Sequence, residues 1–164
     1  PGLVKKLDYE CELAVVLGRD AKDVPAGQTR DYVFGYTILN DVSARDVPTA
    51  HKQWYFGKSL DGFTPIGPCI VTADEFADYP PKLGIRSFVN GEKRQDSNTM
   101  LQIFDIDHVI AELSQGMTLK AGTIIATGTP AGVGMGMDPP QFLKPGDVVR
   151  CEIDGIGTLT NPVK

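Results

Sequence analysis

Short runs of apolar positions, many of them alternating with polar ones, recur along the chain, and this pattern predicts strands rather than long helices. Residues 9–17 alternate at first, then become apolar and end at Gly18. A second run covers 32–39 and ends at Asn40 and Asp41. We also expect strands over 66–72, 83–89, 92–96, 123–127, 148–153 and 156–160, with hairpin turns at Asn90-Gly91 and Asp154-Gly155.

One segment has helical spacing. Its apolar positions 106, 109, 110 and 113 predict a helix over 106–115. Asp105 or Asp107 could cap the start of this helix, and Gly116 could end it. The polar stretch 19–31 has room for one further short helix.

No repeat and no linker interrupts these elements, so the sequence predicts one β-rich α+β domain over residues 1–164, with irregular structure over 44–57. The 164 residues carry a formal charge of −5, from 16 Lys and Arg against 21 Asp and Glu, and the pI is near 4.9. This balance gives no electrostatic reason to bind DNA, RNA or an anionic membrane. No window of the sequence is long and apolar enough to span a membrane.

Three cysteines, Cys11, Cys69 and Cys151, match no zinc-site spacing and no disulfide framework. We therefore expect buried cysteines in an intracellular protein, either cytoplasmic or mitochondrial. The first residues do not form a signal peptide, because no apolar region follows them. The chain does not begin with Met, so we expect a processed N-terminus or a piece of a longer chain.

Two glutamates at the start of the first strand are the leading candidates for chemistry. Glu10 and Glu12 share one strand face, where a bound cation would relieve their repulsion. An exposed face with two solvated glutamates is the alternative. Asp41 would complete an all-oxygen site of charge −3, which suits Mg²⁺, Mn²⁺ or Ca²⁺ rather than zinc or copper. The spacing does not show that the two strands are neighbours, and Asp41 could equally cap a turn or a helix.

Two glycine-containing segments resemble nucleotide loops without meeting their requirements. The phosphate-loop motif needs a glycine five residues before Gly57, and Lys52 stands there. The loop 128–136 is followed closely by Asp-Pro-Pro, which cannot open the helix that a dinucleotide loop requires. We expect this loop to bring backbone close to a ligand or another chain, with a plain cluster of turns as the alternative.

Lys58 follows Gly57 and precedes a turn-rich stretch, so it could be an ordinary surface lysine. If it lies near the three carboxylates, its ammonium could hold a substrate carboxylate or an enolate oxygen. The two histidines, His51 and His108, indicate no site. No Ser-His-Asp or Cys-His order predicts a nucleophile.

Six motifs together resemble the fumarylacetoacetate hydrolase family, in its C-terminal catalytic domain. They occur in the family's order and near its spacing, from about residue 7 to the end of the chain. A further stretch, PPQFL over 139–143, looks most like the branch of fumarylacetoacetate hydrolase domain-containing protein 2. The six motifs are DYECELAVV at 8–16, NDVSARD at 40–46, GKSLDGF at 57–63, PIGP at 65–68, ATGTPAGVG at 126–134 and LKPGDVV at 143–149.

The resemblance implies a fold and a set of site residues. The expected fold is a mixed β-strand roll, a barrel-like sandwich with few short helices, in a homodimer. The expected cofactor is Mg²⁺ or Mn²⁺, with Ca²⁺ as a further option, held by Glu10, Glu12 and Asp41. The expected catalytic residue is Lys58, which is also expected to contact the substrate together with Arg45 and Thr129.

The resemblance also implies chemistry on small 2-oxo or 1,3-dicarbonyl acids through a metal-chelated enolate. We expect a C–C hydrolase of acylpyruvate or fumarylacetoacetate type, or a keto–enol tautomerase or isomerase of oxaloacetate type. A decarboxylase and a non-catalytic remnant of the fold are the alternatives. Hydrolytic members usually carry a His and a Glu before the Glu-x-Glu strand, and the seven residues before Asp8 contain neither. This favours tautomerisation, or a missing N-terminal segment with the general base. Relatives also often carry Gln where this chain has Pro48.

Overall fold

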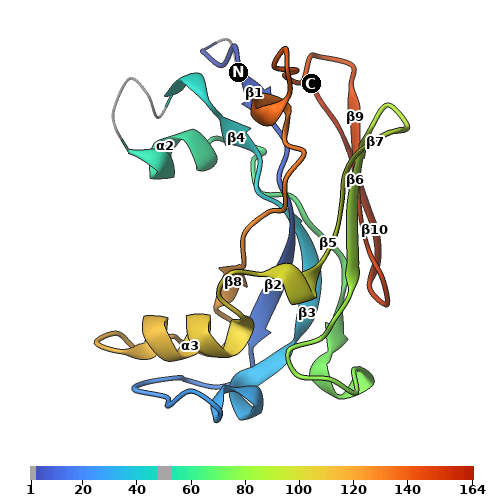
Figure 1. Ribbon diagram of the computed structural model, residues 1–164. Helices are drawn as coiled ribbons and strands as arrows, with labels where there is room; N and C mark the ends of the chain where they lie inside the picture. The colour runs from blue at the N-terminus through green and yellow to red at the C-terminus, as the bar shows by residue number, and fades with distance from the viewer. Residues whose placement is uncertain (1–2, 48–52) are drawn as a thin grey trace.

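The strands form two four-stranded antiparallel sheets and one two-stranded ribbon in the computed structural model, which describes residues 3–47 and 53–164 (Figure 1). The first sheet has the order β5-β3-β2-β8, and the second has the order β10-β9-β6-β7. The β-rich fold class with few short helices is therefore confirmed. No helix among the described residues is long and apolar enough to cross a membrane.

The first sheet is the more deeply buried of the two. Every residue of β2 is buried, and so is nearly all of β3. A strand covered on both faces reads as a continuous apolar run, which explains why the alternation of 9–17 fades. The strands of this sheet are β2 (Cys11–Leu17), β3 (Val33–Asn40), β5 (Ile66–Thr72) and β8 (Ile124–Ala126).

The second sheet keeps one face toward solvent. In β6 and β9 the buried positions alternate with partly exposed ones, which is the period-2 pattern of a half-covered sheet. Asn90 and Gly91 both have positive φ, at 53° and 85°, as the tight turn between β6 and β7 requires. The strands are β6 (Gly84–Val89), β7 (Glu92–Asn98), β9 (Val148–Ile153) and β10 (Gly157–Pro162).

The core lies between the two sheets. Leu13, Val15 and Ile38 from the first sheet join Ile85 and Ile153 from the second in one hydrophobic cluster. Each of these side chains is at most 4% exposed. Burying one such aliphatic side chain contributes roughly 1.5–3 kcal/mol. This core fixes the position of β2, the strand that contains Glu12 and directly follows Glu10.

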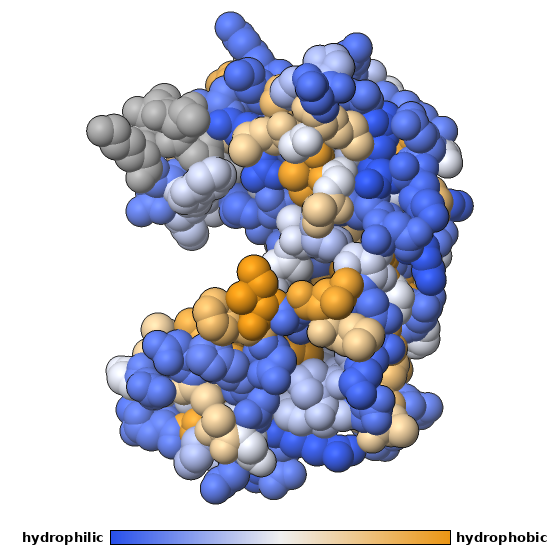
Figure 2. Space-filling view, viewed as in Figure 1, coloured by the Kyte–Doolittle hydropathy of each residue, from blue (hydrophilic) through white to orange (hydrophobic). Residues whose placement is uncertain are grey.

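Helices and short ribbons project from the sheets. Helix α3 (Ile106–Ser114) begins directly after its N-cap residue Asp105, whose carboxylate accepts a hydrogen bond from the His108 amide at 2.8 Å, as predicted for a cap. The remaining elements are the strands β1 (Leu7–Asp8) and β4 (Ser43–Ala44), helix α2 (Trp54–Lys58), and the 3₁₀ turns η1 (Thr29–Tyr32), η2 (Ala73–Glu75), η3 (Thr99–Leu101) and η4 (Gly134–Gly136). Helices α2 and α3 lie on the same side of the molecule (Figure 1), and an open notch separates them in the space-filling view (Figure 2).

Two expectations from the sequence are wrong. The stretch 44–57 is not irregular throughout, because α2 begins at Trp54, where the Gln53 side chain accepts a hydrogen bond from the Tyr55 amide. Cys69 is exposed rather than buried, because it lies on the edge strand β5; Cys11 and Cys151 are buried as expected.

Candidate metal centre and active site

The three predicted carboxylates meet in space. Glu10, Glu12 and Asp41 each offer an oxygen, and these oxygens all lie within 4.8 Å of one another. The cause is the antiparallel pairing of β2 with β3, in which Cys11 lies opposite Asn40. This register places Glu10 and Glu12, at the start of β2, beside Asp41, which directly follows β3. The Asp41 amide donates to the Glu10 carbonyl at 2.8 Å and extends the pairing by one step.

Asn40 explains why the motif has an amide before the aspartate. Its side-chain carbonyl accepts a hydrogen bond from the Glu10 amide at 2.9 Å, and the residue is only 2% exposed. A buried backbone amide without a partner would be costly. Asn40 therefore satisfies the backbone at the point where the glutamates begin.

Two cations lie against the carboxylates. The Lys58 ammonium contacts Glu10 at 2.8 Å and also contacts Asp41. The Arg45 guanidinium contacts Glu10 at 2.6 Å and Asp8 at 3.1 Å. Counted with Asp8, four carboxylates face two cations, so the cluster has a formal charge of −2 when all six groups are ionised.

Burial raises the pKa of the Glu12 carboxyl to about 7. The Gly128 amide, which donates to this carboxylate at 2.9 Å, opposes that shift, and the charges of Asp41 and Glu10 add to it. No ion pair to Glu12 occurs among residues 3–47 and 53–164. Glu12 is thus the carboxylate whose charge is least compensated.

Burial alone would lower the pKa of the Lys58 ammonium, but its hydrogen bonds to Asp41 and Glu10 raise it above 10.5. Lys58 is therefore a permanent cation at neutral pH. Oxygen-only donors and a residual charge of −2 fit a hard divalent cation such as Mg²⁺, Mn²⁺ or Ca²⁺. Glu10, Glu12 and Asp41 are the residues that would hold it.

The loop 127–136 forms one wall of this cluster, and two of its glycines meet neighbouring backbone. A Cβ atom added to Gly132 would lie 2.2 Å from the Arg94 carbonyl oxygen, and one added to Gly134 would lie 2.0 Å from that of Gln141. Only glycine allows these approaches. These close approaches are made to this chain's own backbone, and the predicted approach to a ligand or another chain stays a prediction.

Thr129 and Arg45 are placed by hydrogen bonds to the protein itself. The Thr129 hydroxyl donates to the Cys11 carbonyl at 2.9 Å. Arg45 is 8% exposed and directs its guanidinium to two carboxylates. Their contacts with substrate stay predictions, as does the catalytic role of Lys58.

Two buried polar residues were missed by sequence reasoning. Asp8, fully buried, binds Arg45 and accepts hydrogen bonds from the amides of Gly134 and Met135 at 2.7 and 2.9 Å. Gln95, also fully buried, reaches across from β7 to the segment of Cys11. Asp8 stands within a quoted motif, which could have marked it. Gln95 lies in a polar run that carries no signal of burial.

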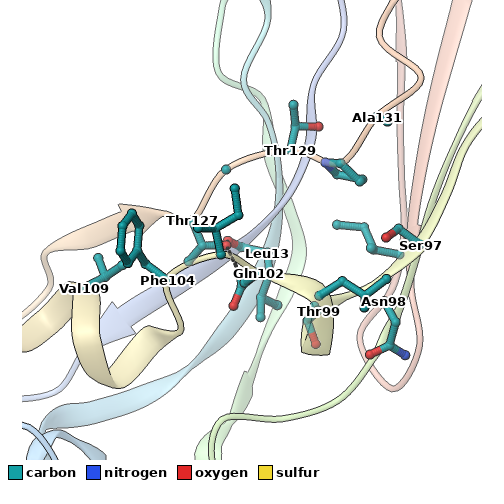
Figure 3. A pocket seen from close by; sticks show the side chains of 15 residues that line it. Leu13, Ser97, Asn98, Thr99, Gln102, Phe104, Val109, Thr127, Thr129 and Ala131 are labelled. Carbon is teal, nitrogen blue, oxygen red and sulfur yellow. Dashed lines mark hydrogen bonds between the residues drawn. The ribbon is translucent and has the colours of Figure 1, made fainter.

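A pocket of about 470 Å³ opens beside this wall (Figure 3). None of its lining residues carries a charge, and Gly128 and Thr129 connect its wall to the carboxylate cluster. Phe104 and Val109 line it at the left of the view, and the Gln102 amide donates to the Thr127 hydroxyl at 2.8 Å. The pocket and the cluster are separate features joined by one loop.

The remaining candidates are placed as follows. The His108 ring stacks on Phe104 at 4.7 Å between ring centroids, at the exposed surface of α3. Three residues singled out in the sequence lie outside the described residues: Lys52 of the failed phosphate-loop match, His51, and Pro48, where relatives often carry Gln.

Known proteins resemble this chain over nearly its whole length. A family model described as fumarylacetoacetate (FAA) hydrolase C-terminal matches residues 1–164. The oxaloacetate tautomerase YisK of Bacillus subtilis is 48% identical over 161 residues, which are 98% of this chain and 53% of that protein. The chain spans about half the length of the curated relatives it matches.

Solved structures give the same picture. A fumarylacetoacetate hydrolase from Exiguobacterium antarcticum superposes with a TM-score of 0.96 at 50% identity, covering 99% of this chain and 58% of that one. A 5-carboxymethyl-2-hydroxymuconate delta-isomerase from Mycobacterium smegmatis superposes with a TM-score of 0.89 at 44% identity, covering 99% and 61%.

Proposed function

The chain belongs to the fumarylacetoacetate hydrolase family, and from this membership we propose that it is the catalytic domain of a divalent-metal-dependent enzyme acting on small 2-oxo or 1,3-dicarbonyl acids. The observation that carries the proposal is the convergence of Glu10, Glu12 and Asp41 within 4.8 Å. The branch of domain-containing protein 2, the homodimer, the single domain and the intracellular location stay predictions.

The cations beside the cluster support an acidic substrate. Lys58 is 27% exposed at its side chain, whereas Arg45 is 7% exposed. Lys58 is therefore accessible to a bound ligand, while Arg45 mainly holds Glu10 in place. When bound, a divalent ion supplies positive charge that stabilises an enolate-like oxygen. Lys58 supplies a second positive charge for the substrate's carboxylate or enolate oxygen.

Among the reactions of the family, we favour keto–enol tautomerisation or double-bond isomerisation. Both remove a proton from one atom of the substrate and return a proton to another, which needs a proton-carrying group but no attacking water. The relatives named an oxaloacetate tautomerase and a delta-isomerase, at 48% and 44% identity, support this choice. The neutral lining of the pocket beside Thr129 leaves room for an uncharged part of the substrate.

Hydrolysis of a carbon–carbon bond is the second candidate. It is favoured by the relative from Exiguobacterium antarcticum, which is named a fumarylacetoacetate hydrolase and superposes with a TM-score of 0.96. Hydrolysis would need a general base for water in addition to the residues of the cluster.

One pair of assays separates these candidates. The purified protein, with Mg²⁺ or with a chelator, is given enol oxaloacetate in one assay and an acylpyruvate in the other, and both are followed by ultraviolet absorbance. We expect Mg²⁺-dependent loss of the enol and little cleavage of the acylpyruvate. Asp41→Asn is the matched control and should abolish the Mg²⁺-dependent part. Absence of both reactions with Mg²⁺ and with Mn²⁺ would favour the non-catalytic alternative.

A further inference from the structure

Among residues 3–47 and 53–164, no strand pairs with the backbone that carries the glutamates on the side away from β3. Strand β8 pairs with β2 only through Ala14, Val15 and Val16. The last main-chain contact between these segments is a hydrogen bond of 3.3 Å from the Thr127 amide to the Leu13 carbonyl. At Cys11, between Glu10 and Glu12, the backbone groups on this side meet side chains instead of a strand.

Gln95 supplies the first of these side chains. Its carbonyl oxygen accepts from the Cys11 amide at 3.2 Å, and its NH₂ group donates to the Pro130 carbonyl at 2.8 Å. The orientation of the Gln95 amide is fixed, because the Cys11 N–H can only donate and the Pro130 carbonyl can only accept. Full burial removes any competing water.

Thr129 supplies the second side chain, and Gln95 determines which hydrogen bond the Thr129 hydroxyl accepts and which it donates. The Gln95 NH₂ group donates to the Thr129 hydroxyl at 2.8 Å. The hydroxyl donates its single proton to the Cys11 carbonyl at 2.9 Å. The remaining lone pair can only accept, so Thr129 can offer a ligand an acceptor but no donor.

We propose that Gln95 is a positioning residue of the metal site, which replaces the missing strand at Cys11 and thereby fixes the spacing of Glu10 and Glu12. It also orients the Thr129 hydroxyl. This inference rests on the proposed function, because it assumes that the glutamates bind a divalent ion. In this proposal Gln95 is not a metal ligand and does not bind the substrate. It acts through its hydrogen bonds to Cys11 and Thr129.

The test is a Mn²⁺ titration of the wild-type protein and of Gln95→Met, by calorimetry or by the electron paramagnetic resonance of free Mn²⁺. Gln95→Met keeps a similar volume and removes the three hydrogen bonds. We expect Mn²⁺ to bind about 10–100-fold more weakly, the usual scale when a group that orients metal ligands is lost.

Thr29→Val is the matched control. Thr29 is fully buried, and its hydroxyl hydrogen-bonds Tyr79 and Asp107 at 2.5 Å each, near α3 and away from the carboxylates. We expect both Thr29→Val and Gln95→Met to lower the melting temperature, but Thr29→Val should leave the Mn²⁺ affinity unchanged. An equal loss of Mn²⁺ affinity in both variants would mean that general destabilisation is the cause and would overturn the proposal.

A second variant covers the case in which Gln95→Met fails to fold. Thr129→Val keeps the shape of the side chain and removes the hydroxyl that donates to the Cys11 carbonyl and accepts from Gln95, while the bond from the Cys11 amide to Gln95 remains, so we expect a several-fold loss of Mn²⁺ affinity. If the wild-type protein binds no Mn²⁺, the proposed function is wrong. If the wild-type protein binds Mn²⁺ and the folded variants at Gln95 or Thr129 bind it equally well, the proposed function stands and the role of Gln95 is wrong.

Discussion

Two adjoining parts of the segment that contains β2 are equally buried but are held in different ways: the polar end, residues 8–12, and the apolar end, residues 13–17. From Leu13 to Leu17 the strand pairs with β3, and its middle residues 14–16 also pair with β8. Leu13, Val15 and Leu17 pack in the hydrophobic core. From Asp8 to Glu12 the backbone pairs with β4 at Asp8 and with β3 at Cys11 and Glu12. The other partners of this segment are side chains and single amides from distant segments: Asn40, Arg45, Lys58, Gln95, Gly128, Thr129 and Gly134.

This difference separates stability from function along one strand. The apolar end gains free energy from burial and needs no particular partner, so it is a rigid base. The polar end gains little from burial, because charges removed from water must be compensated. With four carboxylates and two cations, its compensation is incomplete, and that deficit is what makes the polar end able to bind a cation.

The apolar end should show the larger effect on folding. Leu13 is 1% exposed, so Leu13→Ala should reduce the free energy of unfolding by roughly 2–5 kcal/mol, through lost burial and the cavity left behind. Urea denaturation monitored by Trp fluorescence measures this. The Mn²⁺ affinity of the folded variant should stay close to that of the wild-type protein. A stability loss below about 0.5 kcal/mol would contradict the view that this end is the base of the site.

Metal binding should stabilise the polar end. A thousandfold excess of Mg²⁺ over its Kd should add about 4 kcal/mol at neutral pH, provided that the unfolded chain does not bind it. Asp41→Asn should remove this gain while leaving the metal-free protein as stable or more so, because one of the mutually repelling charges is gone. Thermal melts with Mg²⁺ and with a chelator test both statements. A Mg²⁺ effect that survives in Asp41→Asn would remove Asp41 from the site.

The polar end should control turnover through Lys58. Lys58→Met should lower kcat by about two to three orders of magnitude, the usual scale for the loss of one charge-stabilising group. The Mg²⁺ affinity should not fall, because no ligand is removed and a competing cation is lost from Glu10 and Asp41. Lys93→Met is the control, since Lys93 pairs with Asp96 at the exposed surface. Normal turnover in Lys58→Met would mean that Lys58 has only a structural role, as a counter-ion for Glu10 and Asp41.

The two ends also differ in how well the sequence predicts them. The apolar run 9–17 marks β2 to within two residues, because burial depends on composition and period alone. The three carboxylates could be named from their strand positions, but their meeting depends on the Cys11–Asn40 register, which no local pattern determines. The burial of Gln95 and its contact with Cys11 could not be predicted for the same reason. In the seven consecutive polar residues of β7, only the tertiary fold decides which side chain is buried.

The stability of the metal-free protein should depend on pH through Glu12, the least compensated carboxylate of the polar end, with an effect of about 3.5 kcal/mol at most. The pKa of Glu12 is about 7 in the folded protein against 4.5 in the unfolded chain. The folded state therefore keeps a proton that the unfolded chain loses, so stability falls as the pH rises from about 4.5 to 7. At about 1.4 kcal/mol per pKa unit, the difference of 2.5 units sets that upper limit.

Chemical denaturation of the metal-free protein at pH 5 and at pH 7.5 measures this slope. Glu12→Gln, which has the same shape and no titrating proton, should flatten it. Mg²⁺ binding requires the ionised carboxylate and releases the proton, so Mg²⁺ should stabilise the wild-type protein more at pH 7.5 than at pH 5. A slope that persists in Glu12→Gln would assign the titration to another group. An equal Mg²⁺ effect at both pH values would mean that Glu12 is already ionised at pH 5, and its burial would then be compensated by a cation that the described residues do not provide.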